Sequence, residues 1–190
     1  MAQVATSPPA PSADEFFADL QRPVALADVA AVADLSDGVD LEISYDLPGV
    51  GEVAIAMHEH DGTGLGLVTV GGRIVTEFHL VDGVADQQAH DFGGLDPAQA
   101  RMVAASVAQV WRDPAVARAL AADTKPSEWS CPQRCGLAGA AGAVVVFGVS
   151  GGTCFFLVKL GKPCLAGAAL AGGLVNGWIS ASCQGLACRN

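Results

Sequence analysis

The feature of this sequence that most constrains its fold is the point at which its acidic residues stop. All 20 Asp and Glu residues lie at or before Glu128, together with six basic residues, so this part carries a net charge of −14. The 62 residues that follow contain no acidic residue, four basic residues and all six cysteines. A chain divided in this way is expected to consist of two parts with different surroundings.

Overall composition excludes two broad classes of protein. The chain is 51% hydrophobic and 16% charged, which is too apolar for a disordered protein. Its formal net charge of −10 argues against a nucleic acid partner, because such proteins present a basic face.

The part before Glu128 has the pattern of a small acidic α+β domain. Residues 1–13 are polar and proline-rich, without the apolar run of a secretory signal, and we expect a disordered tail there. Residues 14–122 form the predicted domain. Apolar residues recurring every three or four positions predict two short helices, over 14–20 and 24–35. Alternating apolar and polar residues then predict an antiparallel β-meander with strands at 40–47, 52–60, 65–70, 73–81 and 84–90.

Local signals mark the turns and the helices that follow the meander. Gly71-Gly72 between alternating segments is typical of a two-residue hairpin. Asp96-Pro97 supplies an N-cap and a proline at the first helical position, and Asp113-Pro114 begins a second helix. Residues 123–130 (DTKPSEWS) are polar and contain proline, so we expect a linker there.

The cysteines of residues 131–190 are arranged almost symmetrically about residue 159. An antiparallel hairpin that turns at the Lys-Leu-Gly-Lys-Pro segment 159–163 would bring the cysteines together in three nested pairs: outermost with outermost, middle with middle and innermost with innermost. The fold predicted for this part is therefore an all-α, glycine-rich helical hairpin stapled by three nested disulfides: Cys131 with Cys188, Cys135 with Cys183, and Cys154 with Cys164. Because Cys135 and Cys154 would be about 100° out of phase on one helix, we expect a break at 150–152.

Three alternatives for these cysteines stay open. They can remain reduced as small core residues, or be converted to thioethers. A zinc site is less favoured, because Cys131 and Cys135 have no second close pair and no histidine follows them.

The two arms of the predicted hairpin are long enough to cross a bilayer. Residues 135–158 and 164–188 each lack charge over at least the roughly 20 residues that a helical span requires. Two small-residue spacings, Gly148-x-x-x-Gly152 and Gly173-x-x-x-Gly177, are typical of closely packed helices. Cationic residues at both ends of an apolar body favour contact with anionic membranes. We expect the membrane to be contacted by Lys159, Lys162, Phe155, Phe156 and Trp178.

The part before Glu128 offers one weak candidate for a metal site. His58 and His60 lie on one face of a predicted strand, with His79 on another strand, and imidazoles in such an arrangement bind zinc or copper. No third ligand is recognisable, so solvated strand-end residues are the simpler interpretation. No catalytic triad, nucleotide-binding loop or pair of catalytic acids is evident, and we predict neither an enzyme nor a cofactor.

The cysteine-rich segment from Cys131 to Cys188 resembles the mature part of halocin-type bacteriocin precursors, the microhalocins. In that family an acidic N-terminal portion acts as the immunity protein, and a hydrophobic, cysteine-rich C-terminal peptide is released as the toxin. The resemblance rests on glycine-rich apolar segments between cysteines in about the last 60 residues.

These features together predict a precursor of a secreted, membrane-active antimicrobial peptide. The acidic domain would act as leader, mask or immunity portion, attracted to the cationic segment and covering it in an apolar groove. Its expected partners are the target-cell membrane, its own N-terminal domain, and a dedicated exporter or processing protease. The alternative is a small membrane protein whose acidic cytoplasmic domain is anchored by two spans. Positive charge at the distal tip counts against that alternative.

Overall fold

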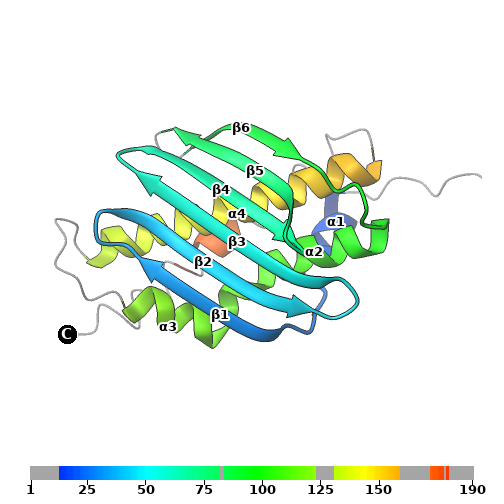
Figure 1. Cartoon of the computed structure of the whole chain (residues 1–190), viewed down its shortest axis with the longest axis horizontal. Coiled ribbons are helices and arrows are strands. Elements are labelled where there is room, and N and C mark those ends of the chain that lie inside the picture. Colours follow the sequence, from blue (N-terminus) through cyan, green and yellow to red (C-terminus); the bar gives the residue numbers. More distant parts are fainter. Residues whose placement is uncertain (1–12, 82–83, 123–130, 159–171, 178, 180–190) are drawn as a thin grey trace, which may run out of the picture.

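The computed structural model of the chain describes residues 13–81, 84–122, 131–158, 172–177 and 179 (Figure 1). Six strands and five helices follow one another in the order α1 (Ala13–Leu20), β1 (Ala27–Asp34), β2 (Gly38–Leu47), β3 (Gly51–His60), β4 (Thr63–Val70), β5 (Arg73–Val81), β6 (Val84–His90), α2 (Pro97–Gln109), the 3-10 helix η1 (Val110–Arg112), α3 (Pro114–Ala122) and α4 (Cys131–Val158). Residues 172–177 are also helical.

The strands form one antiparallel sheet in which every strand pairs with its neighbours in the sequence, from β1 to β6. In β2 the apolar side chains Leu41, Ile43, Tyr45 and Leu47 are buried. The acidic side chains Asp40, Glu42 and Asp46 alternate with them and are exposed. The sheet therefore has one covered face and one face in solvent, as the period of two predicts. The antiparallel meander predicted from the sequence is present.

Tight turns join the central strands. Gly71 and Gly72 connect β4 to β5 with φ values of 57° and 75°, a left-handed conformation that glycine adopts without steric cost. Asp61 and Gly62 connect β3 to β4 with φ values of 50° and 78°. These turns fix the register in which each strand presents its apolar side chains to the same face.

The helices cover one face of the sheet (Figure 1). The start of α2 matches its predicted cap: the Asp96 carboxylate accepts hydrogen bonds from the backbone N–H of Ala98 and Gln99, and Pro97 occupies the first turn. In α3 the predicted inward residues Val116 and Leu120 are buried. Behind the strands, α4 runs obliquely across the sheet, where it packs against α2 and against β2, β4, β5 and β6.

One helix predicted from the sequence is wrong. Residues 27–34, within the predicted helix over 24–35, form the edge strand β1, which pairs with β2. The three-residue spacing of Val29 and Val32 led to the helix, yet Val32 is 70% exposed. Pairing with the free edge of β2 satisfies the backbone of this alanine-rich segment and outweighs its helix propensity.

The predicted all-α, disulfide-stapled C-terminal hairpin is also wrong. Its first arm is α4, which joins the hydrophobic core of the sheet through Ala138, Val145, Val146 and Val149. The helix continues through residues 150–152, where a break was expected. A sheet face lined with large apolar side chains buries these residues of α4, and burial of apolar area is the main driving force of folding.

Candidate functional site: the cradle of helix α4

The candidate site is the surface that receives α4, which we call the cradle: β5, β6, α2 and η1. Between Cys135 and Thr153 the helix contains no charged residue. Val145, Val146 and Val149 are each 0% exposed, and so are the polar side chains of Ser150 and Thr153. A helix that is apolar on all sides is stable in water only when other elements surround it, and here the cradle does so.

Glycines set how closely α4 approaches the cradle. A Cβ added at Gly152 would lie 2.5 Å from His90 Nδ1 and 2.9 Å from Phe92 Cε2. Such distances are shorter than van der Waals contact, so only glycine fits at this position without a shift of its neighbours. At Gly148 an added Cβ would lie 3.8 Å from both the Phe78 ring and the Thr76 methyl group, which is ordinary contact. The Gly148-x-x-x-Gly152 spacing therefore faces the sheet.

The second small-residue spacing has a different outcome. Within the described part of the chain, nothing lies within 4 Å of a Cβ added at Gly173 or at Gly177. Sequence spacing alone does not separate these two pairs of glycines, because it carries no information about the surface that each pair faces.

Phe78 forms the floor of the cradle beneath Gly148. Its ring lies directly over Gly66 of the neighbouring strand β4, where an added Cβ would collide with the ring. Phe78 is 0% exposed. The end of the ring occupies the space that a side chain at Gly66 would need, and another part of the ring faces Gly148, so Phe78 lies between the two glycines. Sequence reasoning missed this role of Gly66.

The far wall of the cradle is formed by η1 and by residues near the C-terminus. Trp111 is fully buried, and two of its ring atoms lie 3.4 Å from a Cβ added at Gly142. Ile179 contacts the same glycine. Trp111 Nε1, Ser150 Oγ and Thr153 Oγ1 are buried without a hydrogen-bond partner in the described structure. Such unpartnered groups lower the net stability of the packed helix.

His90 is the titratable group of the cradle nearest to α4. Its Nδ1 lies 3.3 Å from the Thr76 hydroxyl, and its ring stacks on that of Phe92 with centroids 6.4 Å apart. Burial lowers the pKa of His90, because the charged imidazolium loses hydration. His90 thus favours the neutral form when α4 is in place.

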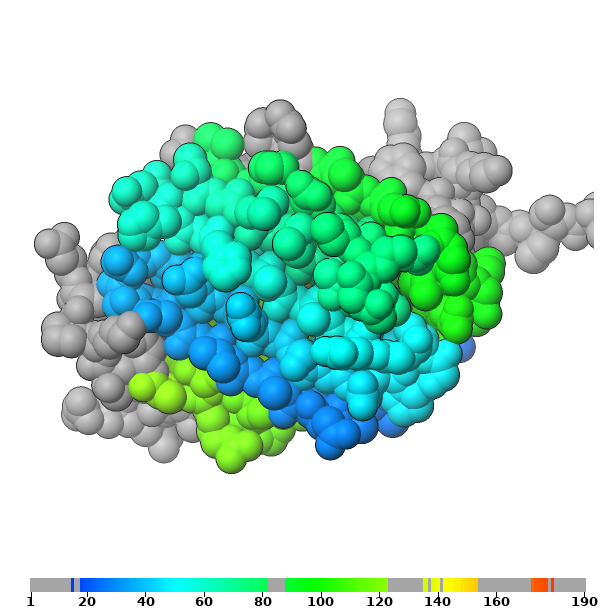
Figure 2. Space-filling model, viewed as in Figure 1, coloured from blue at the N-terminus to red at the C-terminus, as the bar shows by residue number. Residues whose placement is uncertain are grey.

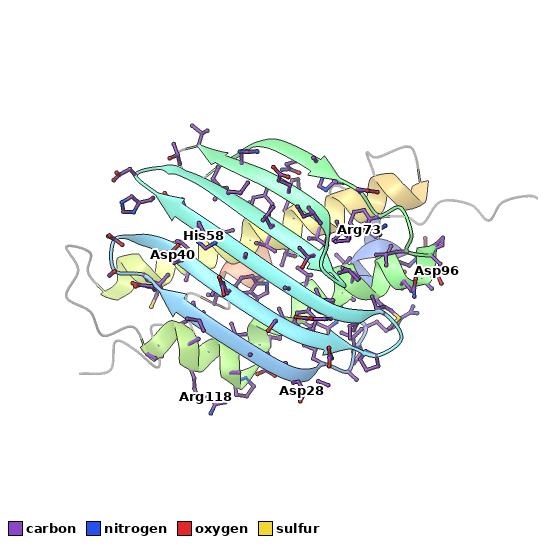
Figure 3. All side chains as sticks on the ribbon, in the orientation of Figure 1. Asp28, Asp40, His58, Arg73, Asp96 and Arg118 are labelled. Carbon is purple, nitrogen blue, oxygen red and sulfur yellow. The ribbon has the colours of Figure 1, made fainter. Side chains whose placement is uncertain are left out.

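Acidic side chains of the central strands lie on the opposite face. Figure 3 labels Asp40 and His58 on the face of the sheet turned toward the viewer, away from the helices. The strands make up the middle of the surface seen from that side in Figure 2. The contact between the sheet and the described part of α4 is therefore largely apolar. The electrostatic attraction expected from the sequence involves the basic residues of the C-terminal segment, whose side chains lie outside the described ones, so it stays a prediction.

The histidines proposed as metal ligands lie on that outer face. His58 Nδ1 is 2.7 Å from Asp40 Oδ1, and both side chains are more than half exposed. His60 lies with them at a hollow of about 330 Å³. His79 is two strands away, since Leu65 stands between it and His58 in the register, and it pairs with Glu77 at 3.1 Å. Within the described residues, no group of three potential ligands is placed to hold a metal ion.

Most of the cysteines lie outside the described side chains. Cys135 is the exception: it is 1% exposed and disulfide-bonded. The pairing of the cysteines stays a prediction, because the partner of Cys135 is not described and the other five side chains lie outside the described ones: Cys131, Cys154, Cys164, Cys183 and Cys188. The expected membrane-contact residues are likewise outside the described side chains: Lys159, Lys162, Phe155, Phe156 and Trp178.

A search of the described helices finds none that is both long and apolar enough to span a bilayer. Comparison of the chain with known protein families, with curated proteins and with solved structures gives no match.

Proposed function

We propose that the chain is the precursor of a secreted, membrane-active antimicrobial peptide, and that the cradle keeps the apolar C-terminal segment away from membranes until it is released. The observation that carries this proposal is the complete burial of Val145, Val146 and Val149 against the sheet and α2. These are the side chains that an inserted peptide would present to lipid.

The position of α4 in the sequence supports the same proposal. The helix begins after residues 123–130, a polar segment suited to proteolysis by its composition, and every residue of the sheet precedes that segment. A single cut there would separate the sheet from α4 without breaking a strand.

The nature of the contact also fits a domain that covers the C-terminal segment and must later release it. The described part of α4 is held by apolar packing and close glycine contacts, with Ser150 and Thr153 left without hydrogen-bond partners among the described residues. Apolar packing is non-directional and is exchanged readily for the apolar interior of a bilayer.

The experiment uses the full chain with a specific protease site replacing residues 123–130, and measures dye release from anionic lipid vesicles. We expect the intact chain to be inactive. After cleavage the two fragments should co-elute on size exclusion and cause little release. The C-terminal fragment, isolated under denaturing conditions and diluted into vesicles, should cause strong release that added N-terminal fragment suppresses.

A matched pair of variants tests whether the cradle is the mask. Gly152→Ala places a methyl group against His90 and Phe92, whereas the methyl group of Gly136→Ala, on the same helix, has no described atom within 4 Å. Cleaved G152A should release more dye than cleaved wild type, and G136A should match wild type. An isolated C-terminal fragment that leaves anionic vesicles intact would contradict the proposal, as would G152A and G136A behaving alike.

A further inference from the structure

A second feature of the molecule is a recess beside α2 that no residue of α4 lines. Its volume is about 410 Å³, which is within the range of small-molecule sites. It lies between α2, the segment 22–25 that leads toward β1, and the turn from β2 to β3. The residues that line it are mostly apolar: Pro23, Val24, Ala25, Leu47, Pro48, Ala98, Met102 and Ala105, with Asp19, Arg22 and Arg101.

One face of α2 forms the longest wall of the recess. Ala98, Arg101, Met102 and Ala105 follow one another at spacings of three, one and three residues, which places them on a single side of the helix. Leu47 is 1% exposed and adds a buried apolar surface from the sheet. The wall thus offers apolar contact with one guanidinium beside it.

Two glutamines of α2 tie the other walls in place. Gln109 Nε2 donates to the carbonyls of Leu20, at 3.1 Å, and Arg22, at 2.8 Å. Its Oε1 accepts from the Val24 N–H at 3.3 Å.

At the other end of the helix, Gln99 Nε2 donates to the Gly49 carbonyl at 3.0 Å and so holds the turn between β2 and β3. Both loops that border the recess are therefore fixed to the same helix. A ligand entering the recess would not have to order them, which favours binding.

The charges at the recess favour an anion. Arg22 is paired with Asp19 at 2.7 Å. Arg101 is exposed and forms no hydrogen bond or ion pair with any described residue. A guanidinium binds a carboxylate through two parallel hydrogen bonds, so Arg101 is available for an acid group.

We propose that this recess binds a small amphipathic carboxylate. The acid group pairs with Arg101, and the apolar body packs against Met102, Leu47 and Ala105. This binding is separate from the masking of α4 and does not depend on it.

The experiment titrates the full chain, labelled with ¹³C-methyl methionine, with decanoate below its micelle concentration. The chain has three methionines. Met102 lines the recess and should shift in a saturable way, whereas Met57, which is 0% exposed under the sheet, serves as an internal control. Decylamine, which has the same chain length and the opposite charge, should bind at least tenfold more weakly, because Arg101 repels it.

Variants assign the binding to the recess. Arg101→Gln should weaken decanoate binding by about tenfold or more, the usual consequence of losing a hydrogen bond to a charged group. Ala98→Trp should fill the recess and abolish binding. Arg118→Gln, at an exposed arginine of α3 whose Nε donates to the Pro114 carbonyl of the same helix, should leave binding unchanged. Absence of a saturable shift at Met102, equal affinity for decylamine, or equal behaviour of R101Q and R118Q would each overturn the proposal.

Discussion

The two faces of the sheet are made from the same strands and differ in what covers them. The inner face carries Leu41, Ile43 and Phe78 and is closed by the helices, whereas the outer face carries Asp40, Glu42 and His58 and is open to solvent. The difference teaches that alternation along a strand fixes which side chains share a face but does not fix what packs on that face. Here the helices that follow the sheet in the sequence do so, among them α4, which has no charged residue from Cys135 to Val158.

The difference between the two faces is tested most directly by introducing the same charge on each side and comparing the loss of stability. Val149→Asp buries a carboxylate without a partner at a 0% exposed position and should lower the free energy of unfolding by about 3–5 kcal/mol. Val32→Asp, at a 70% exposed position of β1, should cost less than about 1 kcal/mol. Urea denaturation followed by Trp fluorescence measures both. Equal losses in the two variants would mean that α4 is not packed on the sheet.

The glycine contacts of α4 should give the next largest effect. Replacing a helical glycine with alanine stabilises a helix by roughly 0.8–1 kcal/mol when the methyl group has room. Gly136→Ala has that room and should raise the free energy of unfolding. Gly152→Ala should lower it by roughly 1–3 kcal/mol, since overpacking outweighs the gain. Thermal melts of the two variants check the sign, and stabilisation by G152A would refute the close contact with His90.

A smaller, pH-dependent difference should come from His90, which is only half buried. Its pKa is lowered below the usual 6.5 by burial, so in that range the unfolded chain binds more protons than the folded one. The contribution is therefore fully present above pH 6.5 and is lost as the pH falls through that value toward the lowered pKa. Comparing unfolding at pH 7.5 and 5.5, His90→Gln should reduce the acid-induced loss. His58→Gln on the outer face should retain it.

The smallest effect is expected for the contact between His58 and Asp40 on the outer face. Asp40→Asn removes the carboxylate that lies 2.7 Å from His58, in a pair whose side chains are both more than half exposed. Exposed pairs contribute between about 0 and 1 kcal/mol, and we expect less than about 0.5 kcal/mol here. Chemical denaturation at low and moderate salt measures it. A loss above 1 kcal/mol would show that the outer face is structurally more important than its exposure indicates.

Sequence patterns predicted the elements whose signals are local. The alternation in 40–47 gives a strand with Leu41 and Ile43 inside, Gly71-Gly72 gives a hairpin turn, and Asp96-Pro97 gives a capped helix start. Each signal acts within a few residues, through side-chain periodicity, allowed φ values or a capping hydrogen bond.

Prediction failed where the partner of a segment decides its structure. Residues 27–34 have spacing that suits a helix, yet they become a strand because the free edge of β2 lies beside them. An apolar groove for the C-terminal segment was expected, but the residues that form it could not be named from the sequence. Gly66, Phe78 and Gly152 come from three separate elements, and their close fit depends on a register that only the folded sheet provides.

The sequence by itself predicted that residues 40–90 form a meander with one apolar and one polar face, and that the segment after Cys135 carries no charge as far as Val158. Only the tertiary structure decided where that segment goes. The sequence pattern of a helix without a polar face does not show which side is buried or what covers it. A lipid bilayer, a second helix and the sheet are all compatible with such a pattern. Burial of Val145, Val146 and Val149 against the inner face of the sheet is the arrangement that the folded chain adopts.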